Sequence, residues 1–392
     1  MDVLYSLFDV NNQRLVNITQ ENTFTNTLNF VFTTLTDDIL SISDPIIDRF
    51  FMNILPRIHY NVKSLILNSL SMERILAGDY PNLSELKIFN VNVKVASHYF
   101  TVLCDLSLTT CYSSTLYKLC IHVMYYHDLL ALLDGRLKQL NTLNVVIVKQ
   151  EYNPTYVYNM NLSHLKCFSL QYDCSSDAYD GEILPLLRRM SNIEVLNLNL
   201  IIDSPVPFID DQQVECMIKY RRLPNVKYHL FSLPFMFDGL QFIDNKFPNI
   251  IFNHVIRLVV DDNIPFEHEF FMRIAWCFPL LKVLTVYNAT SQSPILNYND
   301  NQLYPTTIEY PYLTSLYLLL AHGDYVNRFL NDRKTRLPHL TVLSVNYNDL
   351  RNVTRNFTND RIRLNCIQVK QLSIGPKKIA HSEDFYAYFS LL

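Results

Sequence analysis

One short arrangement of apolar positions returns along most of the chain. It reads apolar, two variable residues, apolar, one variable residue, apolar. Its clearest copies are YPNLSELKI at 80–88, FPLLKVLTV at 278–286, YPYLTSLYL at 310–318 and LPHLTVLSV at 337–345. The last two apolar positions are two residues apart, which is the spacing of a strand with one buried face. We therefore expect a strand at each copy.

Twelve copies, some of them incomplete, align on their first apolar residue, which we call the anchor. The mean spacing of the anchors is about 28 residues, within the range of leucine-rich repeats. The copy at Val226 is poor. Segments compatible with helices lie between anchors, at 94–104, 181–190, 211–222 and 266–277. The anchors are Val62, Leu83, Leu116, Leu140, Leu165, Ile193, Val226, Val255, Leu281, Leu313, Leu340 and Val369.

A unit of strand, loop and helix cannot cover its own apolar face, so such units stack. The pattern predicts an α/β leucine-rich-repeat solenoid, a horseshoe with a parallel sheet on its concave side and helices on its convex side. Residues 61–392 would form this repeat domain of about 12 repeats. A proline often precedes the pattern, and we attribute it to a helix end, because the residue before proline avoids the α region.

Leucine-rich repeats often carry an asparagine three positions after the last apolar residue. Here that position is Asn348 in one unit, but it is Leu70, Val91, Ile201 or Ala289 in others. A continuous asparagine ladder is therefore not expected.

Residues 21–60 precede the repeats and predict a helical cap or linker. Asp44 and Pro45 stand before IIDRFFMNIL, as an N-cap residue and a proline at the first helical position would. Such a helix would cover the open end of the first repeat, whose apolar face would otherwise meet water.

The beginning of the chain reads VLYSLFDVNNQRLVNI at 3–18. It resembles the closing third of an F-box, a phrase of the type L-x-x-[LV]-[CN]-x-[RK]-[FL]. The front of an F-box, a phrase of the L-P-x-E type that docks on a ligase adaptor, is not matched. The matching residues are Leu7, Val10, Asn11, Gln13, Arg14 and Leu15.

F-boxes are commonly followed by leucine-rich repeats in substrate receptors of cullin-RING ubiquitin ligases. The resemblance thus implies that residues 1–20 are a partial F-box-like segment, with Leu7, Val10 and Arg14 as a remnant of the adaptor-binding surface. An L-P-x-E phrase upstream of Met1 would complete the F-box. The alternatives are a relative that has lost its ligase connection and a helical cap whose similarity is accidental.

The composition and the motifs of the chain exclude several kinds of catalytic and metal-binding site. The chain has only six glycines, and the closest two, Gly135 and Gly181, are too far apart for a phosphate-binding loop, a dinucleotide fingerprint or a serine nucleophile elbow. No H-E-x-x-H or C-x-x-C phrase occurs. We therefore expect a protein that is not an enzyme and that has no cofactor and no metal site.

Charge and hydropathy indicate which classes of partner and which cellular compartment to expect. The net charge is −4, which does not favour nucleic acid as a partner. The N-terminus lacks a signal-peptide pattern, and no apolar stretch is long enough to span a membrane. We expect a cytoplasmic or nuclear protein that does not bind membranes.

Two surfaces are candidates for binding a protein. Side chains that alternate with the buried leucines should face the concave side, where repeat proteins bind their partners, although several could simply line the sheet. The residues nominated are Lys87, Phe89, Lys118, Arg257, Asp261, Tyr287 and Tyr317.

The second surface lies in the basic C-terminal quarter, where residues 328–378 contain eleven Lys and Arg but three Asp. Arginine clusters suit carboxylate or phosphate groups, so Arg351, Arg355, Arg361 and Arg363 could hold an acidic or phosphorylated segment. We favour the simpler interpretation that these arginines are solvated charge in a loop.

These observations together predict a protein-binding repeat protein. It would recruit a substrate protein through its concave face, and the F-box resemblance implies that the adaptor of a cullin-RING ligase is a further partner. The alternative is a leucine-rich-repeat interaction scaffold with no role in ubiquitin ligation.

Overall fold

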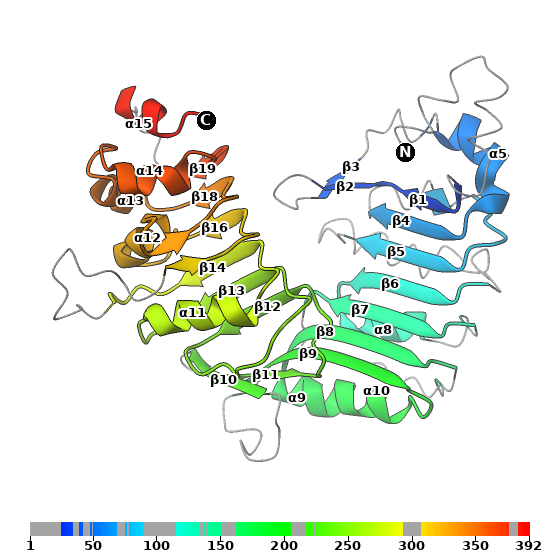
Figure 1. The fold of residues 1–392 in the computed structure, drawn as a ribbon. Coiled ribbons are helices and arrows are strands. Elements are labelled where there is room, and N and C mark those ends of the chain that lie inside the picture. Colours follow the sequence, from blue (N-terminus) through cyan, green and yellow to red (C-terminus); the bar gives the residue numbers. More distant parts are fainter. Residues whose placement is uncertain are drawn as a thin grey trace. The chain divides into compact units, whose positions relative to one another are not determined.

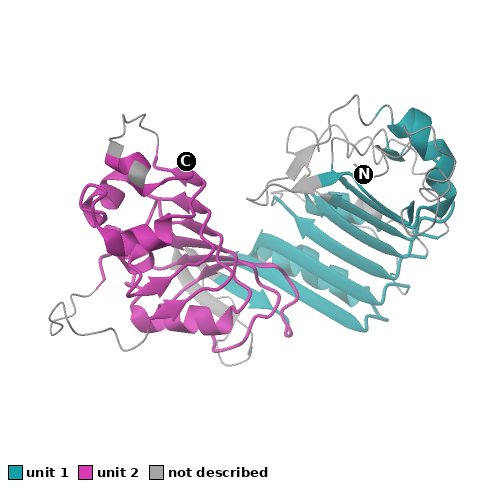
Figure 2. Ribbon diagram, turned by 45° about the horizontal axis from the view of Figure 1, so that its top comes forward, with its two compact units in different colours: residues 1–214, 225–232 teal, residues 215–224, 233–392 magenta. Residues whose placement is uncertain are grey.

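The chain divides into two compact units, each of which is described by itself (Figures 1 and 2). Unit 1 comprises Met1–Val214 and Asn225–Ser232, and unit 2 comprises Glu215–Pro224 and Leu233–Leu392. Both are α/β, and no sheet in the described part of the chain closes into a barrel. The computed structural model describes residues 25–33, 39–41, 48, 50–68, 75–76, 78–89, 115–133, 137, 139–149, 162, 164–204, 217–222, 225–292, 307–375 and 383–392.

Unit 1 is built on a sheet whose neighbouring strands are parallel from β1 to β9, after which β11 pairs with β9 in the antiparallel direction. A short antiparallel pair, β2 (Val31–Thr33) and β3 (Ile39–Ser41), lies outside this sheet. The strands that unit 1 contributes to the sheet, in spatial order, are β1 (Thr27–Asn29), β4 (Ser64–Asn68), β5 (Glu85–Phe89), β6 (Lys118–Val123), β7 (Thr142–Ile147), β8 (Cys167–Ser175), β9 (Val195–Ser204) and β11 (Asn225–Phe231).

Short helical segments connect these strands. One continuous helical stretch leads into the first repeat, another follows β6, and a third follows β8. In chain order the segments are η1 (Phe50–Ile54), α5 (Leu55–Ile58), η2 (His59–Asn61), α8 (Tyr126–Leu132), α9 (Ser176–Ala178), η3 (Tyr179–Ile183) and α10 (Leu184–Arg188).

Unit 2 contains a six-stranded parallel sheet, along one side of which α11, α12, α13 and α14 are stacked (Figure 1). The sheet order is β12 (Gly239–Ile243), β13 (Arg257–Asp261), β14 (Val283–Tyr287), β16 (Ser315–Tyr317), β18 (Val342–Ser344) and β19 (Gln371–Ser373). Its other elements are β10 (Met217–Arg222), the parallel pair β15 (Ile308–Glu309) and β17 (Thr335–Arg336), and the helices α11 (His268–Cys277), α12 (Gly323–Leu330), α13 (Tyr347–Val353), α14 (Asp360–Cys366) and α15 (Glu383–Tyr388).

The spacing of apolar residues in the sequence matches the register of both sheets. In unit 1 the second apolar position pairs from strand to strand as Leu65, Leu86, Leu119, Leu143 and Phe168. In unit 2 the same position pairs as Leu258, Leu284, Leu316 and Leu343. Ten of the twelve anchors are also buried, so the strand prediction is confirmed for these copies.

Two backbone hydrogen bonds recur at the beginning of each repeat. The anchor N–H donates to the carbonyl three residues earlier, as Leu313 does to Tyr310. The carbonyl of the next residue then accepts two N–H groups from the following repeat, as the Lys282 carbonyl does from Thr314 and Ser315 at 2.9 and 3.0 Å. The proline before the pattern, such as Pro311, is the second residue of this tight turn, where its fixed φ is favoured.

In unit 2 the first residue of each turn, three positions before the anchor, is apolar and buried. These residues form a column from repeat to repeat. Phe252 and Phe278 belong to consecutive repeats, and their rings stack with centroids 4.9 Å apart. Further along the chain, Tyr310 holds the corresponding position and donates its hydroxyl to the Phe271 carbonyl of α11 at 2.9 Å. The turn column therefore joins the sheet to the helices.

The repeat pattern fails in the middle of the chain. At the Ile193 copy, Val195 and Leu196 are 46% and 38% exposed, whereas Leu200 and Ile202, further along the long strand β9, are fully buried. The parallel run also ends here, because the next strand in the sheet, β11, is antiparallel. Leu196, Leu200 and Ile202 share one face of β9, so the face is the one that the repeat predicts. The fully buried residues lie further along the strand, where β11 pairs with it.

The helix predictions have mixed outcomes. The segments 181–190 and 266–277 contain α10 and α11, as expected. The prediction for 211–222 is wrong over Met217–Arg222, which forms β10, and 94–104 lies outside the described residues.

Residues 21–60 contain the expected helical stretch but also β1, which pairs with β4 and extends the sheet before the first repeat. Asp44, Pro45 and residues 1–20, with Leu7, Val10 and Arg14, lie outside the described part.

Polar side chains form a column after the strands of unit 2, one or two positions from where the asparagine ladder was sought. Each accepts the N–H two residues later, a turn that Asn and Asp favour. Asn288 additionally donates from Nδ2 to the Ile264 carbonyl of the previous repeat at 2.7 Å. The members are Asp244, Asp262, Asn288, His322 and Asn346.

No helix among the residues described is both long and apolar enough to cross a bilayer.

The register yields a matched test of core packing in unit 1. Leu143 is fully buried, while Leu196, at the equivalent position two strands away, is 38% exposed. Leu143→Ala should lower the free energy of unfolding by about 2–5 kcal/mol, because it removes buried methyl groups and leaves a cavity. Leu196→Ala should cost less than about 1 kcal/mol. Urea unfolding followed by circular dichroism measures both, and equal losses would contradict the assignment of the buried face.

Candidate binding surfaces

The exposed face of the unit 1 sheet carries a row of polar side chains in register. Lys87, Cys120, Asn144, Ser169 and Asn197 are successive partners on β5 to β9. Asn144 Nδ2 donates to Cys120 Sγ at 3.4 Å, and Asn197 Nδ2 donates to Ser169 Oγ at 3.0 Å. Burial raises the pKa of the Cys120 thiol, an effect that the nearby positive charges of Lys118 and Lys87 partly oppose. The row is thus a half-buried, hydrogen-bonded polar strip.

Opposite charges lie on neighbouring strands at one end of this face. Lys118 Nζ lies 3.9 Å from the Glu85 carboxylate on the neighbouring strand. Lys87 and Lys118, both nominated from the sequence, are half-buried and lie on adjacent strands. The Phe89 side chain lies outside the described part of the chain.

The corresponding face of unit 2 carries the other four nominated residues. Asp261 and Tyr287 are direct partners on β13 and β14, and Tyr317 pairs with Thr285, two residues before Tyr287. Arg257 forms two hydrogen bonds to the Asp238 carboxylate, at 2.7 and 2.8 Å. The two tyrosines and Asp261 therefore lie on neighbouring strands, whereas Arg257 is already paired at the beginning of its strand.

The four C-terminal arginines are placed differently from the loop that the sequence suggested. Arg351 is on α13, where its Nε donates to Asn356 Oδ1 at 2.6 Å, and Arg355 is in the turn that follows. Arg361 and Arg363 are on α14. Residues two apart on a helix do not face each other, so this pair cannot act as one clamp. The prediction that these arginines lie mostly in a loop is wrong.

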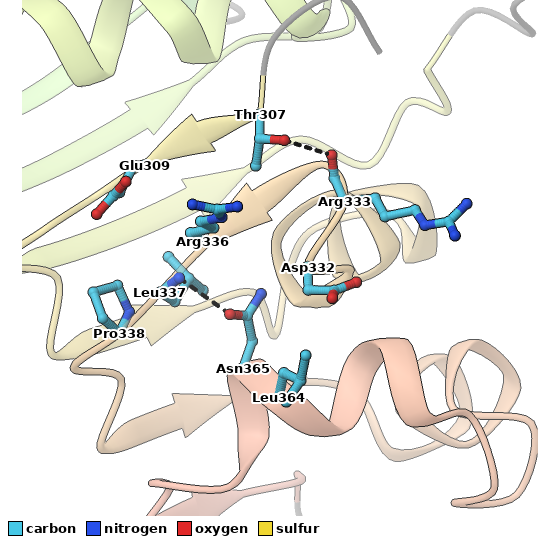
Figure 3. Close-up of a pocket in the computed structure, with 9 residues that line it drawn as sticks. All are labelled: Thr307, Glu309, Asp332, Arg333, Arg336, Leu337, Pro338, Leu364 and Asn365. Carbon is cyan, nitrogen blue, oxygen red and sulfur yellow. Dashed lines mark hydrogen bonds between the residues drawn. The ribbon is translucent and has the colours of Figure 1, made fainter. Parts of the chain in front are cut away.

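An open pocket of about 810 Å³ lies in unit 2 (Figure 3). Two arginines that were not nominated from the sequence, Arg333 and Arg336, line it together with two acidic residues. Leu364, which is 62% exposed, and Pro338 supply its apolar part. The lining residues are Thr307, Glu309, Asp332, Arg333, Arg336, Leu337, Pro338, Leu364 and Asn365.

Asn365 fixes the wall of this pocket. Its Oδ1 accepts the Leu337 N–H at 3.1 Å (Figure 3), and its Nδ2 donates to the Phe329, Leu330 and Thr335 carbonyls at 3.1, 3.2 and 2.7 Å. The first two carbonyls belong to the last turn of α12, where helices lack internal partners. A single buried amide thus ties α14 to α12 and to β17. The sequence held no signal for it, because its partners are backbone groups of other elements.

Scans against protein-family models and against curated proteins give no match. Among the described residues, no three His, Cys, Asp or Glu side chains cluster as metal ligands would.

Asn365→Ala should lower the free energy of unfolding by more than about 2 kcal/mol, because it leaves several buried backbone groups without partners at about 1–3 kcal/mol each. The chain's only tryptophan, Trp276, lies on α11, so its fluorescence during urea unfolding monitors unit 2. Asn352→Ala on the exposed face of α13 is the matched control and should change stability by less than about 0.5 kcal/mol. Equal effects of the two substitutions would contradict the role given to Asn365.

Proposed function

We propose that this chain is a leucine-rich-repeat solenoid that binds a partner protein through the exposed faces of its sheets. The observation that carries the proposal is the register. Equivalent positions of successive repeats lie side by side, so that side chains from many strands form one continuous surface. In unit 2 the helices α11 to α14 lie on the other side of the sheet (Figure 1). Repeat proteins use extended surfaces of this kind to hold proteins.

The chemistry of these faces suits recognition. Half-buried amide, hydroxyl and tyrosine side chains supply hydrogen bonds and apolar contact at low entropic cost. Tyr287 and Tyr317 are the best candidates for energetic anchors, since aromatic residues dominate many interfaces. Burial raises the pKa of the Cys174 and Cys366 thiols, which leaves both protonated and poorly suited to nucleophilic chemistry.

The more specific proposal is that the chain is a substrate receptor of a cullin-RING ubiquitin ligase. It is supported by the resemblance of residues 1–20 to the end of an F-box and by the repeats that follow. Leu7, Val10 and Arg14 would contact the adaptor. The alternative is an interaction scaffold without a ligase.

Binding of the purified ligase adaptor to the full-length chain tests the receptor role. We expect the adaptor to co-elute in gel filtration with the wild-type chain and to be lost when Leu7→Asp and Arg14→Glu are combined. Asn352→Asp together with Arg355→Glu is a control with the same charge changes outside the resemblance. Failure of the wild-type chain to retain the adaptor would leave the scaffold function.

Site-specific photocrosslinking in cells tests the sheet face independently of the ligase. A photoreactive phenylalanine at Tyr287 should yield a defined crosslinked protein, because that position lies on the exposed face of β14. The same group at Trp276, which is 58% exposed on helix α11, is the control. Crosslinks that appear only from Trp276 would move the binding surface to the helical side.

A further inference from the structure

The pocket in unit 2 is separate from the sheet faces and has its own architecture. Its floor is the exposed side of the short parallel pair β15 and β17. Ile308 and Thr335 are buried, at 4% and 1% exposure, so the alternating Glu309 and Arg336 project to the exposed side. The loop before β17 and helix α14 form the walls, the latter through Leu364 and the immobilised Asn365.

The charged groups of the pocket follow an order. Glu309 and Arg336 are direct partners across the β15–β17 pair. Figure 3 shows Arg336 between Glu309 on one side and Asp332 on the other, with the guanidinium of Arg333 pointing away from Arg336. The sequence of charge across the floor is therefore negative, positive, negative.

The side chains of these charged residues form no hydrogen bonds or ion pairs with the rest of the described structure. Neither the Glu309 carboxylate nor the Arg336 guanidinium has a hydrogen bond or an ion pair within the described residues. Asp332 Oδ1 is shielded from solvent and has no hydrogen-bond partner there. A shielded acceptor without a donor is costly, and rotation of the Asp332 carboxylate toward a donor of a bound ligand would relieve that cost.

We propose that this pocket binds an extended peptide segment of a partner protein that carries a basic, an acidic and a basic side chain at alternate positions. Alternate residues of an extended chain point to the same side, about 6.8 Å apart. The acidic residue would meet Arg336, and the two basic residues would meet Glu309 and Asp332. The volume of about 810 Å³ holds a short segment of this kind.

Other ligands fit the pocket less well. A phosphate or a purely acidic peptide would meet Arg336 but would also face the carboxylates of Glu309 and Asp332. Arg333 does not converge with Arg336, so no two-arginine clamp is formed. The inference concerns neither sheet face and does not depend on the function proposed for them.

Fluorescence polarisation with the labelled peptide Gly-Lys-Leu-Asp-Leu-Lys-Gly and the full-length chain tests the proposal. We expect saturable binding, weakened at least about tenfold by Arg336→Glu. The charge-reversed peptide Gly-Glu-Leu-Lys-Leu-Glu-Gly should bind Arg336→Glu more tightly than it binds the wild-type chain. Arg336→Gln should weaken the first peptide without this reversal, and Trp276 fluorescence confirms that each variant is folded.

Lys370→Glu is the matched control, because it makes the same charge change at an exposed residue that does not line the pocket. It should leave the affinity within about twofold. Equal weakening by Arg336→Glu and Lys370→Glu, or no saturation below about 1 mM peptide, would overturn the proposal. So would competition by inorganic phosphate at concentrations similar to those of the unlabelled peptide, which would make the pocket an anion site.

Discussion

At the start of most strands, one backbone carbonyl accepts two consecutive N–H groups from the next repeat, and the hydrogen bonds of the sheet continue from there. The Ile256, Lys282, Thr314 and Thr341 carbonyls do this in turn along unit 2, and the same bond recurs from Lys63 to Lys166 in unit 1. Because this bond sets where each strand begins, it also fixes the register. A slip of one residue would turn every core leucine to the exposed face. The continuous buried rows and the continuous exposed rows are two consequences of this one constraint.

Side chains then fix how the helical layer meets the sheet in unit 2. Buried apolar residues, three of them aromatic, open the turns, and the polar column of Asp244, Asp262, Asn288, His322 and Asn346 closes the loops after the strands. Asn365 satisfies backbone groups of α12 and β17 from α14. The pocket lies beside this amide, which joins α14 to α12 and β17 about thirty residues earlier in the chain. The exposed sheet rows and the pocket are thus separate surfaces of different chemical character. The rows combine hydrogen-bonding, aromatic and charged side chains, whereas the pocket carries an ordered set of charges.

The strands of the repeats could be predicted because their signal is local. An anchor and the two apolar residues that follow it lie within six positions. The spacing that places them on the buried face is therefore directly visible in the sequence. The prediction failed where a neighbour decided the outcome. β9 fully buries Leu200 and Ile202, where β11 pairs with it, and leaves Leu196 on the same face partly exposed. β10 is a strand although its sequence is compatible with a helix. The basic quarter was noticed, but Arg333 and Arg336, and not the nominated arginines, came to line a pocket.

The sequence by itself determined the repeat, its period, most of the core and the positions of the strands, because backbone pairing between equivalent residues needs only periodicity. It also nominated the exposed rows, since alternation along a strand follows from backbone geometry alone. Only the tertiary structure decided that Arg257 is tied to Asp238, that the basic residues of α14 diverge, and that Glu309, Arg336 and Asp332 form an ordered set of charges. These outcomes depend on which distant backbone segment lies beside each side chain. That in turn depends on the paths of the loops between the repeats, which differ in length and which the local repeat pattern does not encode.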